Sequence, residues 1–156
     1  MTDVRIRPAG DGDRAFILGL VPELLAFGPP AWRNLSEMIA VDTDVVGAAL
    51  AGRMEGSAVL IAENAAGARL GFIHVTGERD YYLQDTCGHV ADIVVAPDAR
   101  GQGVGRALLA AAEQWSKDRG YRLLTLNVFV GNRGPQSVYE QAGFHAEVIK
   151  YVKPLV

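Results

Sequence analysis

The residues best suited to chemistry form a glycine-rich turn at residues 100–106, with the sequence RGQGVGR. A strand-like run at 89–95 precedes the turn, and apolar residues recur at helical spacing from about Val104. Glycine has no Cβ, so a ligand can approach the backbone amides of such a turn closely. The first N–H groups of a helix also lack partners within the helix and lie at the positive end of its dipole. The turn therefore predicts a site for a phosphate or pyrophosphate, with Arg100 and Arg106 adding positive charge.

Two common phosphate-binding motifs do not fit this turn. A dinucleotide fingerprint has the pattern G-x-G-x-x-G and an acidic residue about 20 positions further on. Here the glycines recur at every second position, and Thr125 has no acidic neighbour. A nucleotide P-loop has Lys and then Ser or Thr after its glycines, whereas Gly105 is followed by Arg106 and Ala107. The structural alternative is a glycine-rich turn that binds no ligand.

Together with a second motif downstream, the turn resembles the GNAT N-acetyltransferase superfamily. The pyrophosphate loop of that family reads Arg/Gln-x-x-Gly-x-Gly/Ala, which this chain matches from Arg100 to Gly105. A second family signature, an Asn, then a Tyr seven positions later, then Gly-Phe, is matched from Asn132 through Tyr139 to Phe144. The two motifs come in the order of the family, and the resemblance covers residues 88–154.

The resemblance implies an α/β fold of the three-layer α+β type. It has a mixed, mostly antiparallel sheet of six or seven strands, flanked by four helices, with a splay between the strands at 89–95 and 122–130. Local patterns agree with this order of elements, and residues 1–156 are expected to form one acetyltransferase domain. Periodicity and turn residues predict strands at 4–7, 57–63, 70–77, 89–95, 123–130 and 148–152, and helices at 11–26, 34–51, 104–119 and 135–142.

By the same resemblance acetyl-CoA is the acyl donor, and no metal takes part. The strand before the turn is expected to bulge and to free the amides of Ile93, Val94 and Val95 for the pantetheine arm, one of them as an oxyanion donor. Asn132 matches the family residue that contacts this arm, and its alternative role is a cap for the helix at Pro135. The other expected donor contacts are Arg100, Gly101, Gln102, Gly103, Val104, Gly105, Arg106 and Tyr139.

Tyr139 matches the family tyrosine that protonates the departing thiolate as a general acid. A phenol with a pKa of about 10 can donate a proton to a developing thiolate. Outside the motif, an aromatic residue at helical spacing would be assigned to the core. The frame from Asn132 to Phe144 favours the catalytic role.

Two residues are candidates for the base that would take the proton from the amine. In many members of the family it lies six positions before the last residue of the bulged strand, which is His89 when counted from Val95. Histidine changes its charge near neutral pH, which suits this task directly or through a water chain. Strand alternation places Asp92 on the opposite face from His89 unless the bulge resets the register, so Asp92 is the second candidate.

The acceptor pocket is expected where the first helices, the loop with two tyrosines and the cofactor strands converge. Trp32, Tyr81 and Tyr82 are the aromatic candidates for acceptor contacts. The sequence does not separate the possible acceptors, which are polyamines, amino-sugar antibiotics, free amino acids and peptide amines. It also leaves the length of the donor's acyl chain undetermined. Cys87 has no paired base in the sequence, so direct attack by the amine is expected rather than an acyl-cysteine.

Composition limits the classes of binding partner and the cell compartment that are expected for this chain. The net charge is −3 with no block of Lys or Arg, which argues against nucleic acid and anionic membranes as partners. No run reaches the ~18 apolar residues of a membrane span, and the start of the chain lacks the apolar region of a signal peptide. The single cysteine suits a reducing compartment, so a cytoplasmic protein is expected.

The expected function is thus transfer of an acetyl group from acetyl-CoA to a primary amine of a small molecule or peptide. The alternative is a non-catalytic acyl-CoA sensor or interaction module on the same fold. Such a protein has no turnover, so a substitution of Tyr139 could not lower it. The last predicted strand, 148–152, could pair with a second subunit in a homodimer, or its edge could be blunted by Lys150 and Lys153.

Overall fold

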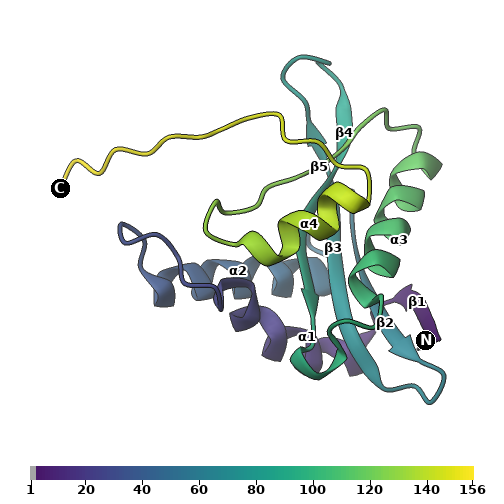
Figure 1. Ribbon diagram of the computed structural model, residues 1–156. Helices are drawn as coiled ribbons and strands as arrows, with labels where there is room; N and C mark the ends of the chain where they lie inside the picture. Colours follow the sequence, from purple (N-terminus) through teal and green to yellow (C-terminus); the bar gives the residue numbers. More distant parts are fainter. Residues whose placement is uncertain (1–2) are drawn as a thin grey trace.

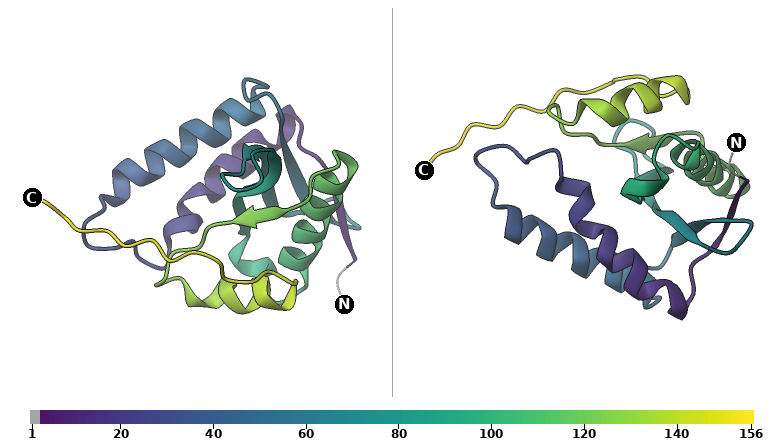
Figure 2. Two further views of the ribbon diagram at one scale, coloured as in Figure 1. Left: turned by 90° about the horizontal axis from the view of Figure 1, so that it is seen from above. Right: turned by 60° about the horizontal axis from the view of Figure 1, so that its bottom comes forward.

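The computed structural model describes residues 3–156, which form one mixed five-stranded sheet with helices on both faces. Strands β1 to β4 pair antiparallel in sequence order, and β5 runs parallel to β4 at the edge. Helices α1 and α2 cover one face, and α3 and α4 lie on the other (Figures 1 and 2). The elements are β1 (Val4–Pro8), α1 (Arg14–Leu20), α2 (Leu35–Leu50), β2 (Ser57–Asn64), β3 (Arg69–Arg79), β4 (Thr86–Val95), α3 (Val104–Asp118), β5 (Leu124–Leu126) and α4 (Arg133–Gln141).

The core lies on both faces of the central strand β3. Phe72 and Ile73 are adjacent and both completely buried. Because successive side chains of a strand point to opposite faces, this pair shows that β3 is covered on both sides. On the α3 side, Leu108 and Val104 repeat at a spacing of four residues and are buried, as their helical periodicity predicts.

The first predicted helix is divided. Residues 11–26 form a 3₁₀ turn (Asp11–Asp13), then α1, then a second 3₁₀ turn (Val21–Leu25). Pro22 has no N–H and its ring crowds the preceding turn, so the α-helical hydrogen bonds end just before it. No helix in the described residues 3–156 is long and apolar enough to cross a membrane.

Two expectations for the sheet are wrong. It has five strands rather than six or seven, and residues 148–152 form no strand. The strand predicted at 123–130 is limited to Leu124–Leu126. A strand requires a neighbour for its backbone hydrogen bonds, whereas residues 145–156 are exposed and lead away from the sheet (Figure 1).

A buried carboxylate joins the first strand to the central strands. The Asp13 side chain is 3% exposed and lies 2.7 Å from both Arg7 Nη1 and Arg69 Nε. The Gly10 amide donates a further hydrogen bond to it, at 2.8 Å. Hydrogen bonds from the Arg7 guanidinium hold the pKa of this carboxyl well below its usual range. The side chain therefore links β1 to β3, and makes no capping hydrogen bond to α1.

Asp13→Asn is expected to destabilise the fold by about 2–3 kcal/mol, because it leaves two arginines without their buried counter-charge. Since the folded-state pKa is depressed, this contribution is complete above the unfolded pKa of about 4 and is lost as the pH falls further. Urea unfolding at pH 7 and at pH 3 measures both effects. The exposed Asp11→Asn is the matched control, and an equal loss in both variants would contradict the assignment.

Candidate active site

The glycine-rich turn has the geometry of an anion site. Gly101 and Gly103 have φ values of 76° and 80°, in the left-handed region that favours glycine. A Cβ at either position would meet nothing within 4 Å, so it is this backbone conformation that requires glycine. Gly103 is the N-cap of α3, and no side chain caps the helix. The first amides of α3 are thus available to an anion.

Strand β4 carries a bulge at Ala91. The register with β3 shifts there, because His74 lies opposite Asp92 while the next residue, Val75, lies opposite Val90. Ala91 is therefore the extra residue, and the alternation of side chains restarts after it.

The bulge brings both candidate bases to the same face of the sheet. A Cβ at Gly88 would collide with the Ser116 hydroxyl of α3, so His89, the next residue, points to the opposite face, toward α1 and α2. Asp92 lies on this face too, because its partner His74 is two residues from Thr76, the partner of His89, and directly opposite residues share a face. Burial and then the negative charge of Asp92 raise the pKa of Asp42 on α2. Simple alternation would have placed the two on opposite faces.

Strand β4 separates from β5 at the same point. Their register covers three pairs and ends with Val90 opposite Leu126. The Ala96 amide donates to Leu70 of β3 at 2.8 Å. In an antiparallel pair the bonding residues alternate, so the Val94 amide also faces β3. The amides of Ile93 and Val95 face the other edge, where no strand of the described chain pairs with them.

His89 is held through its Nδ1 atom. This nitrogen lies 2.8 Å from Thr125 Oγ1 and 3.2 Å from Glu78 Oε2. The carboxylate can only accept, and the threonine hydroxyl donates to the Gly88 carbonyl at 3.4 Å. A proton on Nδ1 suits both neighbours, which leaves the lone pair of Nε2 to accept a proton. Glu78 and Thr125 were not predicted, since the pairing of Thr125 with His89 depends on the parallel register of β5 with β4.

Asp92 is more enclosed than His89. It is 8% exposed, and its Oδ2 lies 3.4 Å from Nδ1 of His74, which is completely buried. The Nε2 atom of His74 has no hydrogen-bond partner within residues 3–156. The carboxylate is thus turned toward the interior, which makes His89 the better placed of the two candidate bases.

Tyr139 lies on α4 and packs against the core. Its ring meets that of Phe144 at 6.2 Å in a T-shaped arrangement. Burial raises the pKa of its phenol, so the hydroxyl keeps its proton. Asn132 is the N-cap of α4 but makes no side-chain capping bond, so the alternative role predicted for it is not observed.

The two arginines of the turn have protein partners. Arg100 Nη2 lies 3.1 Å from Glu23 Oε2, and Arg106 Nη2 donates to Gln141 Oε1 at 3.0 Å. The second contact joins α3 to α4, the helix of Tyr139. Gln102 donates through Nε2 to the Asp98 carbonyl at 3.3 Å.

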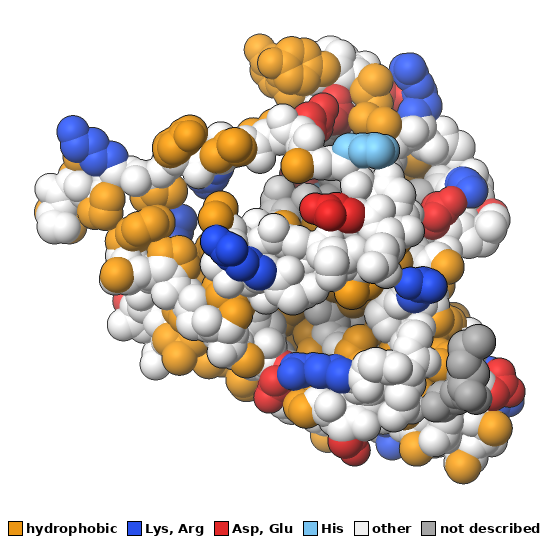
Figure 3. Space-filling view, viewed as in Figure 1, with side chains coloured by type: hydrophobic (Ala, Val, Ile, Leu, Met, Phe, Trp, Pro, Cys, Tyr) orange, Lys and Arg blue, Asp and Glu red, His pale blue; other side chains and the backbone are white. Residues whose placement is uncertain are grey.

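The three aromatic residues expected to bind the acceptor are not brought together. Tyr81 and Tyr82 meet edge to face at 5.1 Å in the hairpin between β3 and β4, and are 78% and 89% exposed. Figure 3 shows hydrophobic side chains gathered over this hairpin, at the top of the molecule. Trp32 lies in the loop before α2, at another end of the fold (Figure 1), and has no ring contact with them within residues 3–156.

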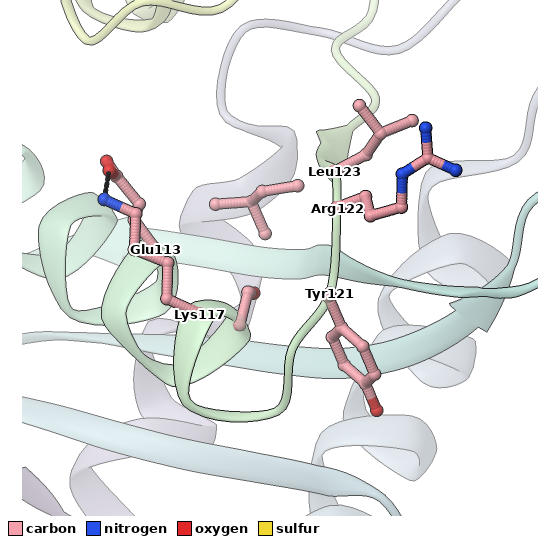
Figure 4. A pocket seen from close by; sticks show the side chains of 7 residues that line it. Glu113, Lys117, Tyr121, Arg122 and Leu123 are labelled. Carbon is pink, nitrogen blue, oxygen red and sulfur yellow. Dashed lines mark hydrogen bonds and ion pairs between the residues drawn. The ribbon is translucent and has the colours of Figure 1, made fainter.

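A surface pocket of about 120 Å³ lies elsewhere, between α3 and the segment that leads to β5 (Figure 4). Glu113 and Lys117 form an ion pair at 2.6 Å on its rim. None of the expected site residues lines it. Its lining is Glu113, Ser116, Lys117, Tyr121, Arg122, Leu123 and Leu124.

Comparison with known proteins gives one consistent family. Residues 29–144 match the Acetyltransferase (GNAT) family. The Bacillus subtilis (strain 168) protein called uncharacterized N-acetyltransferase YhfO is 31% identical over 92% of this chain and 91% of its own length. Aminoglycoside N(6′)-acetyltransferase type 1 of Klebsiella aerogenes is 38% identical over 64% of this chain and 68% of its own length. The match to uncharacterized N-acetyltransferase MJ1207 of Methanocaldococcus jannaschii, at 42% identity, covers 39% of this chain and 27% of that protein.

A solved structure agrees over nearly the whole chain. AAC(6′)-Iy in complex with the bisubstrate analogue CoA-S-monomethyl-acetylneamine has a TM-score of 0.71 at 25% identity, over 98% of this chain and 99% of that one. The mixed sheet flanked by four helices, predicted from the two motifs, is thereby confirmed. This chain belongs to the acetyltransferase (GNAT) family and is an N-acetyltransferase.

Proposed function

We propose that this chain transfers an acetyl group directly from acetyl-CoA to a primary amine of a small molecule or peptide. One observation carries the proposal: β4 separates from β5 at the Ala91 bulge and leads into the uncapped N-terminus of α3. A row of free amides followed by an anion site matches an elongated ligand with a thioester at one end and phosphates at the other. The bound CoA analogue in AAC(6′)-Iy supports the same donor.

The residues present fit this donor. The amides of residues 103–106 would bind the pyrophosphate, and Arg100 and Arg106 would add charge at the rim. The free amides of Ile93 and Val95 would pair with the pantetheine arm, with Asn132 beside it. Acetyl-CoA would supply the acetyl group and a thiolate as leaving group.

The chain's own groups would handle the charges and protons. His89 Nε2 would take a proton from the ammonium of the acceptor, directly or through water, so that the nitrogen can form its bond to the acetyl carbon. The amide of Ile93 or Val95 would stabilise negative charge on the thioester oxygen. As the carbon–sulfur bond breaks, the Tyr139 hydroxyl would give its proton to the sulfur, and the second proton that the nitrogen loses would return to the phenolate through solvent.

The face that carries His89 would favour a cationic acceptor. Asp92 and Asp42 both lie on this face. In the described chain Asp42 has no basic partner. Negative charge near a binding site raises the local concentration of ammonium groups. The name of the Klebsiella relative makes aminoglycosides the first acceptors to examine. The single cysteine suits a reducing compartment, and the cytoplasm is the location we assign.

Thiol release from acetyl-CoA in the presence of aminoglycosides, polyamines, amino acids and peptides tests the function. We expect release that depends on one acceptor class, with an acetylated product of that class in the mass spectrum. If acetyl-CoA binds but no acceptor in the panel stimulates release, the amine acceptor class proposed here is wrong.

Gly103→Ala is expected to raise the KM for acetyl-CoA about tenfold. An alanine held in the left-handed conformation costs about 1–2 kcal/mol, which distorts the turn where the amides must converge on the phosphates. Initial rates at varied acetyl-CoA measure the change. Gly19→Ala is the matched control, since this glycine also has open space around it but an ordinary φ. Equal KM values in the two variants would contradict a phosphate role for the turn.

A further inference from the structure

The first arginine of the glycine-rich turn is paired with a carboxylate from the α1–α2 side of the sheet. Arg100 Nη2 lies 3.1 Å from Glu23 Oε2, and the two side chains are 56% and 33% exposed. Glu23 belongs to the 3₁₀ turn Val21–Leu25, which connects α1 to the loop before α2 (Figure 1). His89 points to this same face of the sheet. The ion pair therefore joins the proposed phosphate site to the proposed acceptor face.

The second arginine of the turn has a partner without charge. Arg106 Nη2 donates to the neutral amide oxygen of Gln141 at 3.0 Å. A phosphate can approach Arg106 without displacing an anion, whereas at Arg100 it meets a guanidinium that already has a counter-charge. Carboxylates and phosphates accept from the same planar fork of guanidinium N–H groups. Glu23 and a phosphate therefore compete for Arg100.

Residues 21–28, which we call the 21–28 segment, also contact the loop that follows β5. The ring of Phe27 meets that of Phe129 with 5.5 Å between the centroids. The loop itself is tied to α4, since Gln136 Nε2 donates to the carbonyls of Phe129 at 3.4 Å and of Asn132 at 3.1 Å. The 21–28 segment thus contacts both borders of the gap between β4 and β5 in which we place the donor.

We propose that Glu23 is the counter-ion that the pyrophosphate of the donor displaces from Arg100, and that this displacement loosens the 21–28 segment. The inference rests on the proposed function, because it takes acetyl-CoA as the ligand of the turn. A partly exposed ion pair contributes little stability in water, so a pyrophosphate held by the helix amides can replace it. The coupling is reciprocal: Glu23 weakens donor binding by the same factor by which the donor weakens the contact of the segment with Arg100.

Only one end of the segment is free to respond. Val21 and Leu25 are buried and anchor the segment in the core. The exposed end at 26–28 carries Phe27, so its loosening would let this ring separate from Phe129 on the acceptor face. Glu23 is therefore a positioning residue that acts through Arg100 and couples the donor site to the acceptor side.

Titration calorimetry with coenzyme A tests the counter-ion role without any acceptor or turnover. Glu23→Gln is expected to bind coenzyme A about threefold more tightly than the unmodified chain, the size of effect expected for loss of a partly exposed ion pair. Arg100→Gln should bind it about tenfold more weakly. In the double variant Glu23→Gln, Arg100→Gln the loss of Glu23 should bring no gain, because its effect acts through Arg100. Glu113→Gln, which removes an equal charge from the ion pair with Lys117 on α3, is the control and should leave the affinity unchanged.

Hydrogen exchange reports on the segment in the same samples. The amides of Ala26 and Gly28 donate to the carbonyls of Glu23 and Leu25, at 3.3 Å and 3.1 Å. We expect these amides to exchange faster once coenzyme A is added to the unmodified chain, and to exchange fast with or without it in Glu23→Gln. A ligand that only covered the segment would slow them instead.

Other results contradict the proposal in ways that can be told apart. An equal gain from Glu23→Gln with and without Arg100 means a general repulsion between Glu23 and the phosphates. Weaker binding by Glu23→Gln means that Glu23 holds Arg100 ready for the phosphate rather than competing with it. Unchanged or slower exchange at Ala26 and Gly28 means that the segment stays in place. If no variant binds coenzyme A, the proposed donor is wrong, and so is the role of Glu23.

Discussion

His89→Gln is expected to lower kcat about 100-fold, because it removes the group that takes the proton from the amine. Glutamine keeps a polar side chain of similar size beside Thr125 and Glu78 but cannot accept this proton. The KM for acetyl-CoA should stay within a factor of two, since the proposed donor contacts lie on the turn and on backbone amides. Steady-state rates with a fixed saturating acceptor measure both constants.

A matched control separates this role from a structural one. His145→Gln, in the exposed end of the chain, should leave kcat unchanged. A lower kcat in His89→Gln at an unchanged KM for acetyl-CoA indicates loss of the proton acceptor rather than loss of the fold.

The neighbours of His89 provide a graded test. Glu78→Gln and Thr125→Val each remove one partner of Nδ1, so each should lower kcat less than His89→Gln does. If Asp92→Asn instead lowered kcat about 100-fold while His89→Gln left it unchanged, Asp92 would be the base.

Tyr139→Phe is the second large effect, and kcat is again expected to fall about 100-fold. The ring and its contact with Phe144 are kept, so folding and the KM for acetyl-CoA should change little. The lost group is the hydroxyl that would protonate the thiolate. Stopped-flow measurement of thiol release, with the acetylated amine followed in the same samples, shows whether the chemical step is the one that slows.

The proposed role of Tyr139 also predicts how the activity changes at alkaline pH. Tyr139 acts while it holds its proton, and burial raises the pKa of its phenol above the ordinary value of 10.0. Loss of activity from its ionisation should therefore begin only above about pH 10. Tyr121→Phe is the control, since that ring is also partly buried and packs edge to face on Trp115. Equal rates for Tyr139→Phe and the unmodified chain would contradict the role of Tyr139 as the general acid.

Much of the local backbone structure around the candidate site could be predicted because its signals are local in sequence. The glycines at 101 and 103 require a backbone conformation that few other residues adopt, and the structure shows that conformation. The spacing from Asn132 to Phe144 likewise predicted a helix that carries Tyr139. Apolar periodicity predicted α2 within a residue at each end, because Asn34 caps its start and Gly52 follows its last turn.

What could not be predicted depends on contacts between distant segments. Alternation alone cannot show which residue bulges, so the common face of His89 and Asp92 appears only once the register of β3 with β4 is known. Glu78 and Thr125 reach His89 from two different strands, at separations of 11 and 36 residues in the chain. Residues 148–152 have a strand-forming sequence, but they are exposed and pair with no strand of residues 3–156, and sequence pattern alone cannot show whether a pairing forms.

The central claim is direct transfer, and one experiment tests it most closely: mass spectrometry of the protein and the amine after incubation with acetyl-CoA, with and without the acceptor found in the panel. We predict one acetylated amine for each thiol released, and no acetyl group on the protein, Cys87 included, when the acceptor is left out. An acetylated Cys87 peptide that forms without acceptor and transfers its acetyl group when acceptor is added would contradict direct attack. Thiol release without acetylated amine would contradict the N-acetyltransferase chemistry itself.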